Sequence, residues 1–173
     1  MSAVALAGAV VSCARSNSQV TEPVPLVGKA ASTTYIYATP EGEPIGSAQM
    51  LGRETVLLFV TTYDDVSLAM TRRLSDLQRR RTPRFNALLV ALEPAQNALL
   101  VAVYRDSLPE RFPVALADQS SLDGGGPFGD MRAVPGLVLL DRDGRLVFRG
   151  FGVDAFRRVS ELLMASASAR LGT

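Results

Sequence analysis

Histidine and tryptophan are both absent from this chain of 173 residues, and only one cysteine, Cys13, is present. Without histidine the chain has no imidazole that could act as a general base, a metal ligand or a pH switch. A single cysteine excludes an internal disulfide and a dithiol redox couple. The net charge of +1 excludes the strongly basic surface typical of nucleic-acid-binding proteins. We therefore predict no metal site, no cofactor and no nucleic-acid partner.

Long apolar runs are also scarce, and the run at residues 3–11 is too short to span a bilayer, which needs about 20 apolar residues. It suits the apolar region of a secretory signal. The next residues complete the sequence Val10-Val11-Ser12-Cys13, which resembles a bacterial lipobox, the motif whose cysteine receives a lipid. The alternative is an ordinary buried element with a small core cysteine. We predict a signal peptide at 1–13 ending at a lipidated Cys13, a flexible tether at 14–32 and one globular domain at 33–173.

Hydrophobic residues make up 47% of the chain, which is enough for a folded core. Continuous apolar runs predict strands that are covered on both faces, and an apolar stripe at spacings of four, four and three predicts a helix. The expected elements are a hairpin at 33–46, strands at 55–61 and 85–92, helices at 65–81 and 94–104, a short strand at 114–117, a loop at 118–133, a hairpin at 136–151 and a helix at 154–171. This order predicts an α/β fold, with helices on both faces of a mixed sheet.

The junction between the first buried strand and its helix carries two adjacent carboxylates, Asp64 and Asp65. Either residue is a good N-cap, and both complement the helix dipole. An acid/base pair or a metal site is the alternative, but neighbouring residues rarely converge on one atom and no histidine completes the set. Ser67 lacks a histidine that would activate it as a nucleophile, so we interpret it as a first-turn helical serine.

Two further motifs have simple structural interpretations. The glycines of "GGGPFG" at 124–129 match a dinucleotide fingerprint in spacing, but they lie in a predicted loop and include Pro127. The sequence "DRDG" at 141–144 resembles the start of a calcium loop, but the later ligand positions are Arg145 and Gly152. We predict a loop for the first motif and a hairpin turn for the second.

Arginines cluster on the predicted helix and just after it, at positions 72, 73, 79, 80, 81 and 84. We interpret them as a solvated face whose charges suit the carboxyl end of a helix. Contact with anionic lipid headgroups is the alternative.

Two stretches resemble a known family. The sequence "VLLFVTTYDDVS" resembles the stretch "hhhhFWAxWCxxC" (h is apolar) of the thioredoxin-like thiol–disulfide oxidoreductases of the bacterial envelope, the TlpA/ResA type. In this alignment Tyr63 replaces the tryptophan, and Asp64 and Ser67 replace the two cysteines. The sequence "AVPGLVLLDRDGRLVFRGFG" resembles the family's "VPTTFLIDxxGxIVxRxxG", and Pro135 falls on the cis-proline. The resemblance implies a thioredoxin-like fold with an N-terminal β-hairpin extension and a cis bond between Val134 and Pro135.

The resemblance also implies where a partner would bind. In this family an extended substrate segment lies in a groove that corresponds here to Tyr63, Asp64, Asp65, Ser67, Val134 and Pro135. Because carboxylate and hydroxyl groups cannot exchange with a disulfide, we predict a redox-inactive, non-enzymatic envelope lipoprotein that faces the periplasm and binds a protein partner through this groove. The alternatives are an enzyme, either completed by a partner's cysteine or hydrolytic, and a structural subunit of an envelope complex.

Overall fold

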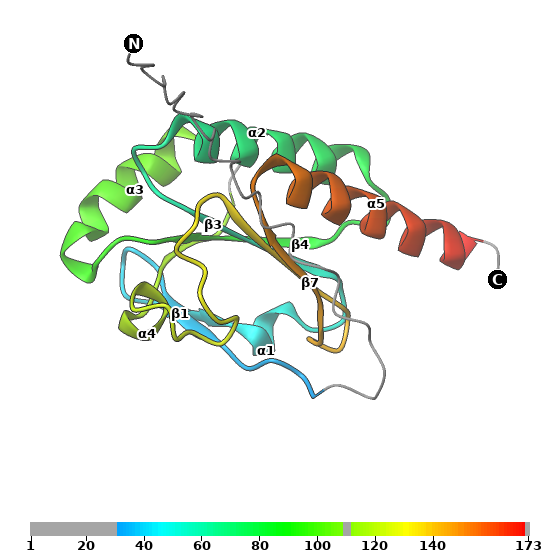
Figure 1. The fold of residues 1–173 in the computed structure, drawn as a ribbon, viewed down its shortest axis with the longest axis horizontal. Coiled ribbons are helices and arrows are strands. Elements are labelled where there is room, and N and C mark those ends of the chain that lie inside the picture. Colours follow the sequence, from blue (N-terminus) through cyan, green and yellow to red (C-terminus); the bar gives the residue numbers. More distant parts are fainter. Residues whose placement is uncertain (1–30, 109–111, 172–173) are drawn as a thin grey trace, which may run out of the picture.

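A computed structural model describes residues 31–108 and 112–171, which form a seven-stranded sheet and its covering helices (Figure 1). The elements in chain order are β1 (Ile36–Ala38), β2 (Pro44–Gly46), α1 (Ser47–Met50), β3 (Thr55–Val60), α2 (Asp65–Arg80), β4 (Asn86–Ala91), the 3-10 turn η1 (Ala95–Asn97), α3 (Ala98–Ser107), β5 (Val114–Leu116), α4 (Gln119–Leu122), β6 (Gly136–Leu140), β7 (Leu146–Phe151) and α5 (Gly152–Leu171). Cys13 and the predicted signal peptide lie outside the described residues, as does all but the end of the predicted tether.

The sheet is mixed, as the order of elements predicted, with strands in the order β2-β1-β5-β4-β3-β6-β7. Strands β3, β4 and β5 are parallel, whereas β6 pairs antiparallel with both β3 and β7. Every residue of β3 is buried, because this strand lies near the middle of the sheet and is covered on both faces. The N-terminal hairpin adds β1 and β2 beyond β5.

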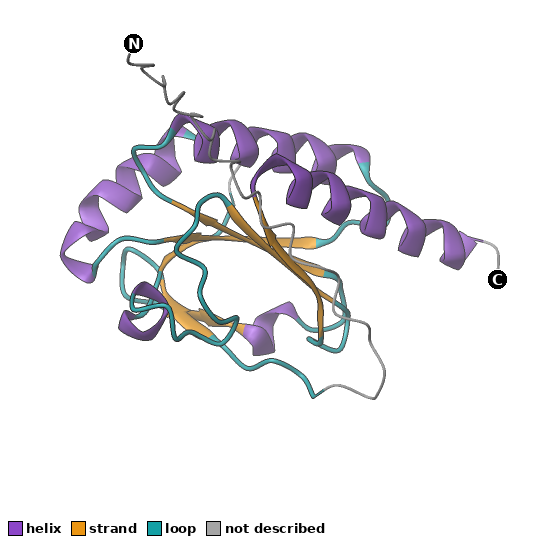
Figure 2. Ribbon diagram, in the orientation of Figure 1, coloured by secondary structure: helices purple, strands orange, loops and turns teal. Residues whose placement is uncertain are grey.

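The two faces of the sheet are covered unequally. Figure 2 shows the three long helices, α2, α3 and α5, together on one side of the strands, and the four-residue helices α1 and α4 on the other. The first core contains the inward residues of the long helices, such as Met70, Val101 and Leu163. The second core is aromatic and includes Tyr35, Tyr37, Phe59 and Phe128. None of the described helices is both long and apolar enough to cross a lipid bilayer.

Three local predictions need correction. The stretch 118–133 is not merely a loop: Asp118 caps the short helix α4, and Phe128 and Met131 are buried in the second core. The short helix α1 was not predicted at all. Val66, the first member of the predicted apolar stripe of α2, is 49% exposed. It lies in the first turn of α2, and four residues separate this helix from the end of β3.

Candidate functional site

The register of the sheet brings the two predicted site segments to the same edge. Phe59 of β3 pairs with Gly136 of β6, and the two strands are antiparallel. The residues that follow β3 and those that precede β6 therefore lie at one end of the sheet. Here we use the name α2 N-terminal surface for Tyr63, Asp64, Asp65, Ser67, Val134 and Pro135, the six residues that the sequence singled out.

Asp64 is the N-cap of α2, as predicted. Its carboxylate accepts hydrogen bonds from the backbone N–H groups of Val66 at 3.2 Å and Ser67 at 2.8 Å. The hydroxyl of Ser67 donates to the same carboxylate at 2.7 Å. The bond from the Ser67 hydroxyl, and after it the backbone bonds from Ser67 and Val66, hold the pKa of Asp64 below its usual value. The anion thus satisfies N–H groups that otherwise lack partners at a helix start.

Ser67 has no access to a substrate. Its side chain is 0% exposed, and its hydroxyl is engaged with Asp64. This geometry agrees with the interpretation of Ser67 as a structural serine of the first turn. Within the described part of the chain no group of three or more acidic, cysteine or histidine residues is arranged to hold a metal ion.

Tyr63 and Asp65 are the outward-facing members of the surface. Tyr63 is 81% exposed, and Asp65 and the adjacent Val66 are exposed as well. Among the described residues neither Asp64 nor Asp65 has a cationic partner; Asp65 is open to a ligand, whereas both carboxylate oxygens of Asp64 already accept hydrogen bonds from the first turn of α2. The exposed part of the site therefore combines one aromatic ring with uncompensated negative charge.

The Val134–Pro135 peptide bond is cis, as the family motif predicted. Pro135 is buried, and its carbonyl accepts a hydrogen bond from the N–H of Gly152 at 2.8 Å. Val134 is half-buried, and within the described ranges its own N–H and carbonyl have no hydrogen-bond partner. Its backbone is thus open to pairing beside the start of α2.

Two residues near this site escaped sequence reasoning. Glu93 is buried, and its carboxylate accepts hydrogen bonds from the Thr62 hydroxyl at 2.8 Å and from the Asn97 amide at 2.9 Å. It thereby ties the segment that carries Tyr63 to η1. Thr61 is also buried, and its hydroxyl has no hydrogen-bond partner among the described residues. The only feature of the sequence that could have pointed to Glu93 is that it directly follows the strand predicted at 85–92.

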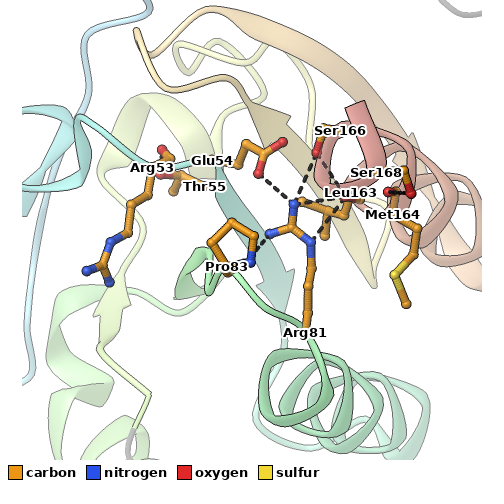
Figure 3. A network of polar contacts seen from close by, with 9 residues as sticks. All are labelled: Arg53, Glu54, Thr55, Arg81, Pro83, Leu163, Met164, Ser166 and Ser168. Carbon is orange, nitrogen blue, oxygen red and sulfur yellow. Dashed lines mark hydrogen bonds and ion pairs between the residues drawn. The ribbon is translucent and has the colours of Figure 1, made fainter. Parts of the chain in front are cut away.

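Arg81 corrects the prediction of a fully solvated arginine face. It follows the last residue of α2 and is 2% exposed. Its guanidinium donates to the Glu54 carboxylate at 2.7 Å and to the carbonyls of Leu163 and Pro83, contacts that are drawn in Figure 3. Arg72, Arg73, Arg80 and Arg84 are exposed as predicted, and Arg79 pairs with Asp76.

The glycine-rich and aspartate-rich motifs are turns. Residues 124–129 follow α4 and contain a backbone bond from Gly129 to Gly126, which is not the strand-to-helix turn of a dinucleotide site. In "DRDG" the Asp141 carboxylate accepts the N–H groups of Asp143 at 2.9 Å and Arg145 at 2.8 Å. Gly144 has a φ of +77°, a conformation that favours glycine. The hairpin turn is confirmed.

Solved structures of thiol–disulfide proteins share this architecture. A secreted Mycobacterium tuberculosis disulfide oxidoreductase, homologous to E. coli DsbE, aligns with a TM-score of 0.57 and 16% identity over 76% of this chain and 95% of its own. The exposed lipoprotein thioredoxin Etrx1 of Streptococcus pneumoniae strain TIGR4 aligns with a TM-score of 0.56 and 17% identity over 75% and 99%. StoA of Bacillus subtilis aligns with a TM-score of 0.54 and 20% identity over 76% and 97%.

No protein-family model matches the chain, and no curated protein matches its sequence. At identities of 16–20% the likeness to solved structures shows the fold. The chain has the thioredoxin-like fold of thiol–disulfide oxidoreductases, as the two sequence motifs predicted. It carries one cysteine, Cys13, and Asp64 and Ser67 stand at the start of α2.

Proposed function

We propose that this chain is a redox-inactive thioredoxin-fold lipoprotein of the bacterial envelope, and that its α2 N-terminal surface binds an extended segment of a protein partner. One observation carries the proposal: the carboxylate of Asp64 occupies the N-cap of α2 and is bonded to Ser67. A thioredoxin-type cysteine works as a thiolate stabilised at a helix N-terminus. Here a carboxylate takes that electrostatic position, and none of the residues that the structure describes is a cysteine that could exchange with a disulfide.

The chemistry of the surface favours a basic, extended partner segment. Tyr63 offers a rigid amphipathic ring of the kind that anchors protein interfaces. The uncompensated charges of Asp64 and Asp65 attract Arg or Lys on the partner. The open N–H and carbonyl of Val134 provide one donor and one acceptor for main-chain pairing, as a sheet edge does for an added strand.

The enzymatic alternatives gain no support at this surface. Ser67 is buried and has no activating base, and the aspartates serve the helix start and the surface charge. An activity completed by a partner's cysteine would have to proceed without a cysteine from the part of the chain that the structure describes. A structural subunit that uses another face is the remaining alternative, and the experiment below separates it from the proposal.

The direct test is recovery of a partner by the full chain from solubilised membranes of the source bacterium. In the test variant Tyr63→Ala removes the ring, and Asp64→Asn removes one charge while keeping an N-cap residue. We expect recovery to fall at least about tenfold, since an interface anchor and a charge contact are both lost. Recovery by the unmodified chain should weaken with added salt, because exposed charges are screened.

The matched control is Arg72→Ala with Arg73→Ala, two exposed residues of the same helix. This variant should recover the partner as the unmodified chain does, and both variants should keep their thermal midpoints within a few degrees. If the arginine pair is required and the Tyr63/Asp64 pair is not, the partner binds another face and the proposal is wrong.

Lipid anchoring through Cys13 belongs to the same proposal. Its support is the apolar run that ends in Val10-Val11-Ser12-Cys13 ahead of a polar, proline-bearing stretch. We expect the unmodified chain in the membrane fraction, with the mass of a diacylglycerol adduct on Cys13, and Cys13→Ser in the soluble fraction. Membrane-derived protein with an intact Met1 and an unmodified Cys13 would contradict this assignment.

A further inference from the structure

The end of the sheet opposite the α2 N-terminal surface is hollowed. The hollow has a volume of about 340 Å³ and is lined by Gly52, Arg53, Glu54, Pro83, Arg84 and Arg142. These residues come from the segments before β3, before β4 and after β6, which meet because β3 pairs with both neighbours. We name Arg53, Arg84 and Arg142 the arginine face. Arg84 belongs to the arginine cluster noted in the sequence, for which contact with anionic lipid headgroups was the alternative, whereas Arg53 and Arg142 lie far from that cluster in the chain.

The arginine face carries uncompensated positive charge. All three arginines are exposed, and none has a carboxylate partner among the described residues. Glu54 also lines the hollow, but its carboxylate forms an ion pair with the buried guanidinium of Arg81 at an N–O distance of 2.7 Å. Figure 3 shows this pair. The acidic residues beside Arg142, Asp141 and Asp143, are both paired with Arg145.

The N-terminal part of the chain enters the domain beside this face. The N–H of Thr33 donates to the carbonyl of Gly144 at 2.8 Å, in the same turn that carries Arg142. The N–H of Gly52 donates in turn to the carbonyl of Arg142 at 2.9 Å. In Figure 1 the blue start of the described chain lies near the turn between β6 and β7. The described part of the chain, which thirty residues precede, thus begins close to the arginine face.

The arginine face and the α2 N-terminal surface lie at opposite ends of β3. The strand runs for six residues from Thr55, next to Glu54, to Val60, next to Thr61. At about 3.3 Å per residue the two surfaces are separated by roughly 20 Å. A membrane that contacted the arginine face would therefore leave Tyr63 and its neighbours pointing away from the bilayer.

We propose that the arginine face docks on anionic phospholipid headgroups and orients the anchored domain with its partner-binding surface away from the membrane. The orientation rests on the proposed lipid anchor at Cys13, because the tether meets the domain at this face. Guanidinium groups match phosphate oxygens with paired hydrogen bonds, and three of them without carboxylate partners suit several lipid phosphates at once. Headgroups of an anionic leaflet supply such phosphates at high local density.

The test measures vesicle binding by the full chain carrying Cys13→Ser, so that no lipid is attached. We compare co-sedimentation with phosphatidylglycerol–phosphatidylcholine vesicles (about 3:7) and with pure phosphatidylcholine vesicles, at low and high salt. Each arginine near an anionic surface contributes about fivefold to binding, so Arg84→Gln with Arg142→Gln should weaken binding to the anionic vesicles roughly 25-fold. Binding to phosphatidylcholine should not change.

The matched control is Arg72→Gln with Arg73→Gln, which removes the same charge from exposed positions on α2. It should bind the anionic vesicles within about twofold of the Cys13→Ser chain. Equal loss in both variants, or none in either, would overturn the proposal. The proposal would also be overturned if the chain bound inorganic phosphate with a sub-millimolar dissociation constant, measured by titration calorimetry, but showed no preference for anionic vesicles over phosphatidylcholine vesicles. Partner recovery is not measured in this assay, so its outcome and that of the proposed function are independent.

Discussion

At the scale of single residues, Asp64 and Asp65 are neighbours in the chain but only Asp64 is engaged in the start of α2. The carboxylate of Asp64 accepts three hydrogen bonds, one from a side-chain hydroxyl and two from backbone N–H groups. Asp65 occupies the first turn and is exposed. The N-cap residue was predictable because a short acidic side chain directly before an apolar helical stripe is a local signal.

Substitution of Asp64 should therefore reduce stability in a pH-dependent way. We expect Asp64→Ala to lower the free energy of unfolding by about 1 kcal/mol at neutral pH, and Asp64→Asn to lower it less, since asparagine also caps. The pKa of Asp64 in the folded chain lies below its usual value of 3.8. A depressed carboxylate pKa stabilises the folded state above the unfolded-state pKa, and this contribution is lost as pH falls through the folded-state pKa.

The stability gap between the unmodified chain and Asp64→Asn should thus be full at neutral pH and shrink as the pH falls below about 4. Urea unfolding at a series of pH values measures this gap. A gap that stays constant down to pH of about 2 would show that the charge of Asp64 does not contribute.

At the scale of elements, Arg81 joins α2 to β3 and α5. It follows the helix, and its guanidinium reaches Glu54 just before β3 and the carbonyl of Leu163 in α5. It also lies 5.6 Å from the ring centre of Phe85. The sequence placed Arg81 on a solvated face because it stands among exposed arginines. Its burial depends on α5, whose Leu163 lies 82 residues further along the chain, and no local pattern reports such a contact.

Removal of the Arg81 side chain should therefore destabilise the fold strongly. We expect Arg81→Ala to lower the free energy of unfolding by about 3–5 kcal/mol, because Glu54 and the Leu163 carbonyl lose a buried partner. The exposed neighbour Arg80 provides the control, and Arg80→Ala should change stability by less than about 0.5 kcal/mol. Denaturant unfolding of both variants measures the difference. A cost for Arg81→Ala of under about 1 kcal/mol would contradict the structural importance of this contact.

The other helices and strands could be predicted from the sequence when their apolar pattern was long enough to be recognised. Six-residue apolar strands such as β3 and β4, and the stripe of α2, repeat often enough to be recognised in the sequence. Helices α1 and α4 have only four residues each, which is one turn and shows no periodicity. Phe128 and Met131 are core residues, but they lie in a glycine-rich stretch that resembles a surface loop. The six candidate site residues were singled out through the family motif and remain a prediction, whereas the three residues of the arginine face are brought together only by the fold.

At the scale of the whole molecule, the thioredoxin-like fold carries Asp64 and Ser67 at the start of α2. The side chains of positions 64 and 67 already meet, since the Ser67 hydroxyl lies 2.7 Å from the Asp64 carboxylate. Position 67 is fully buried, and position 64 is half-buried at the helix N-terminus, where a thiolate is stabilised. We therefore predict that two cysteines introduced at these positions pair in a disulfide.

Catalysed reduction of a disulfide substrate by dithiothreitol measures whether the chain is redox-inactive, as proposed. We expect the unmodified chain to leave the rate at its uncatalysed value, since one cysteine cannot cycle between dithiol and disulfide. The chain carrying Asp64→Cys and Ser67→Cys in a Cys13→Ser background should form an internal disulfide and accelerate the reaction. Acceleration by the unmodified chain, or free thiols that never pair in the double-cysteine variant, would contradict the proposal.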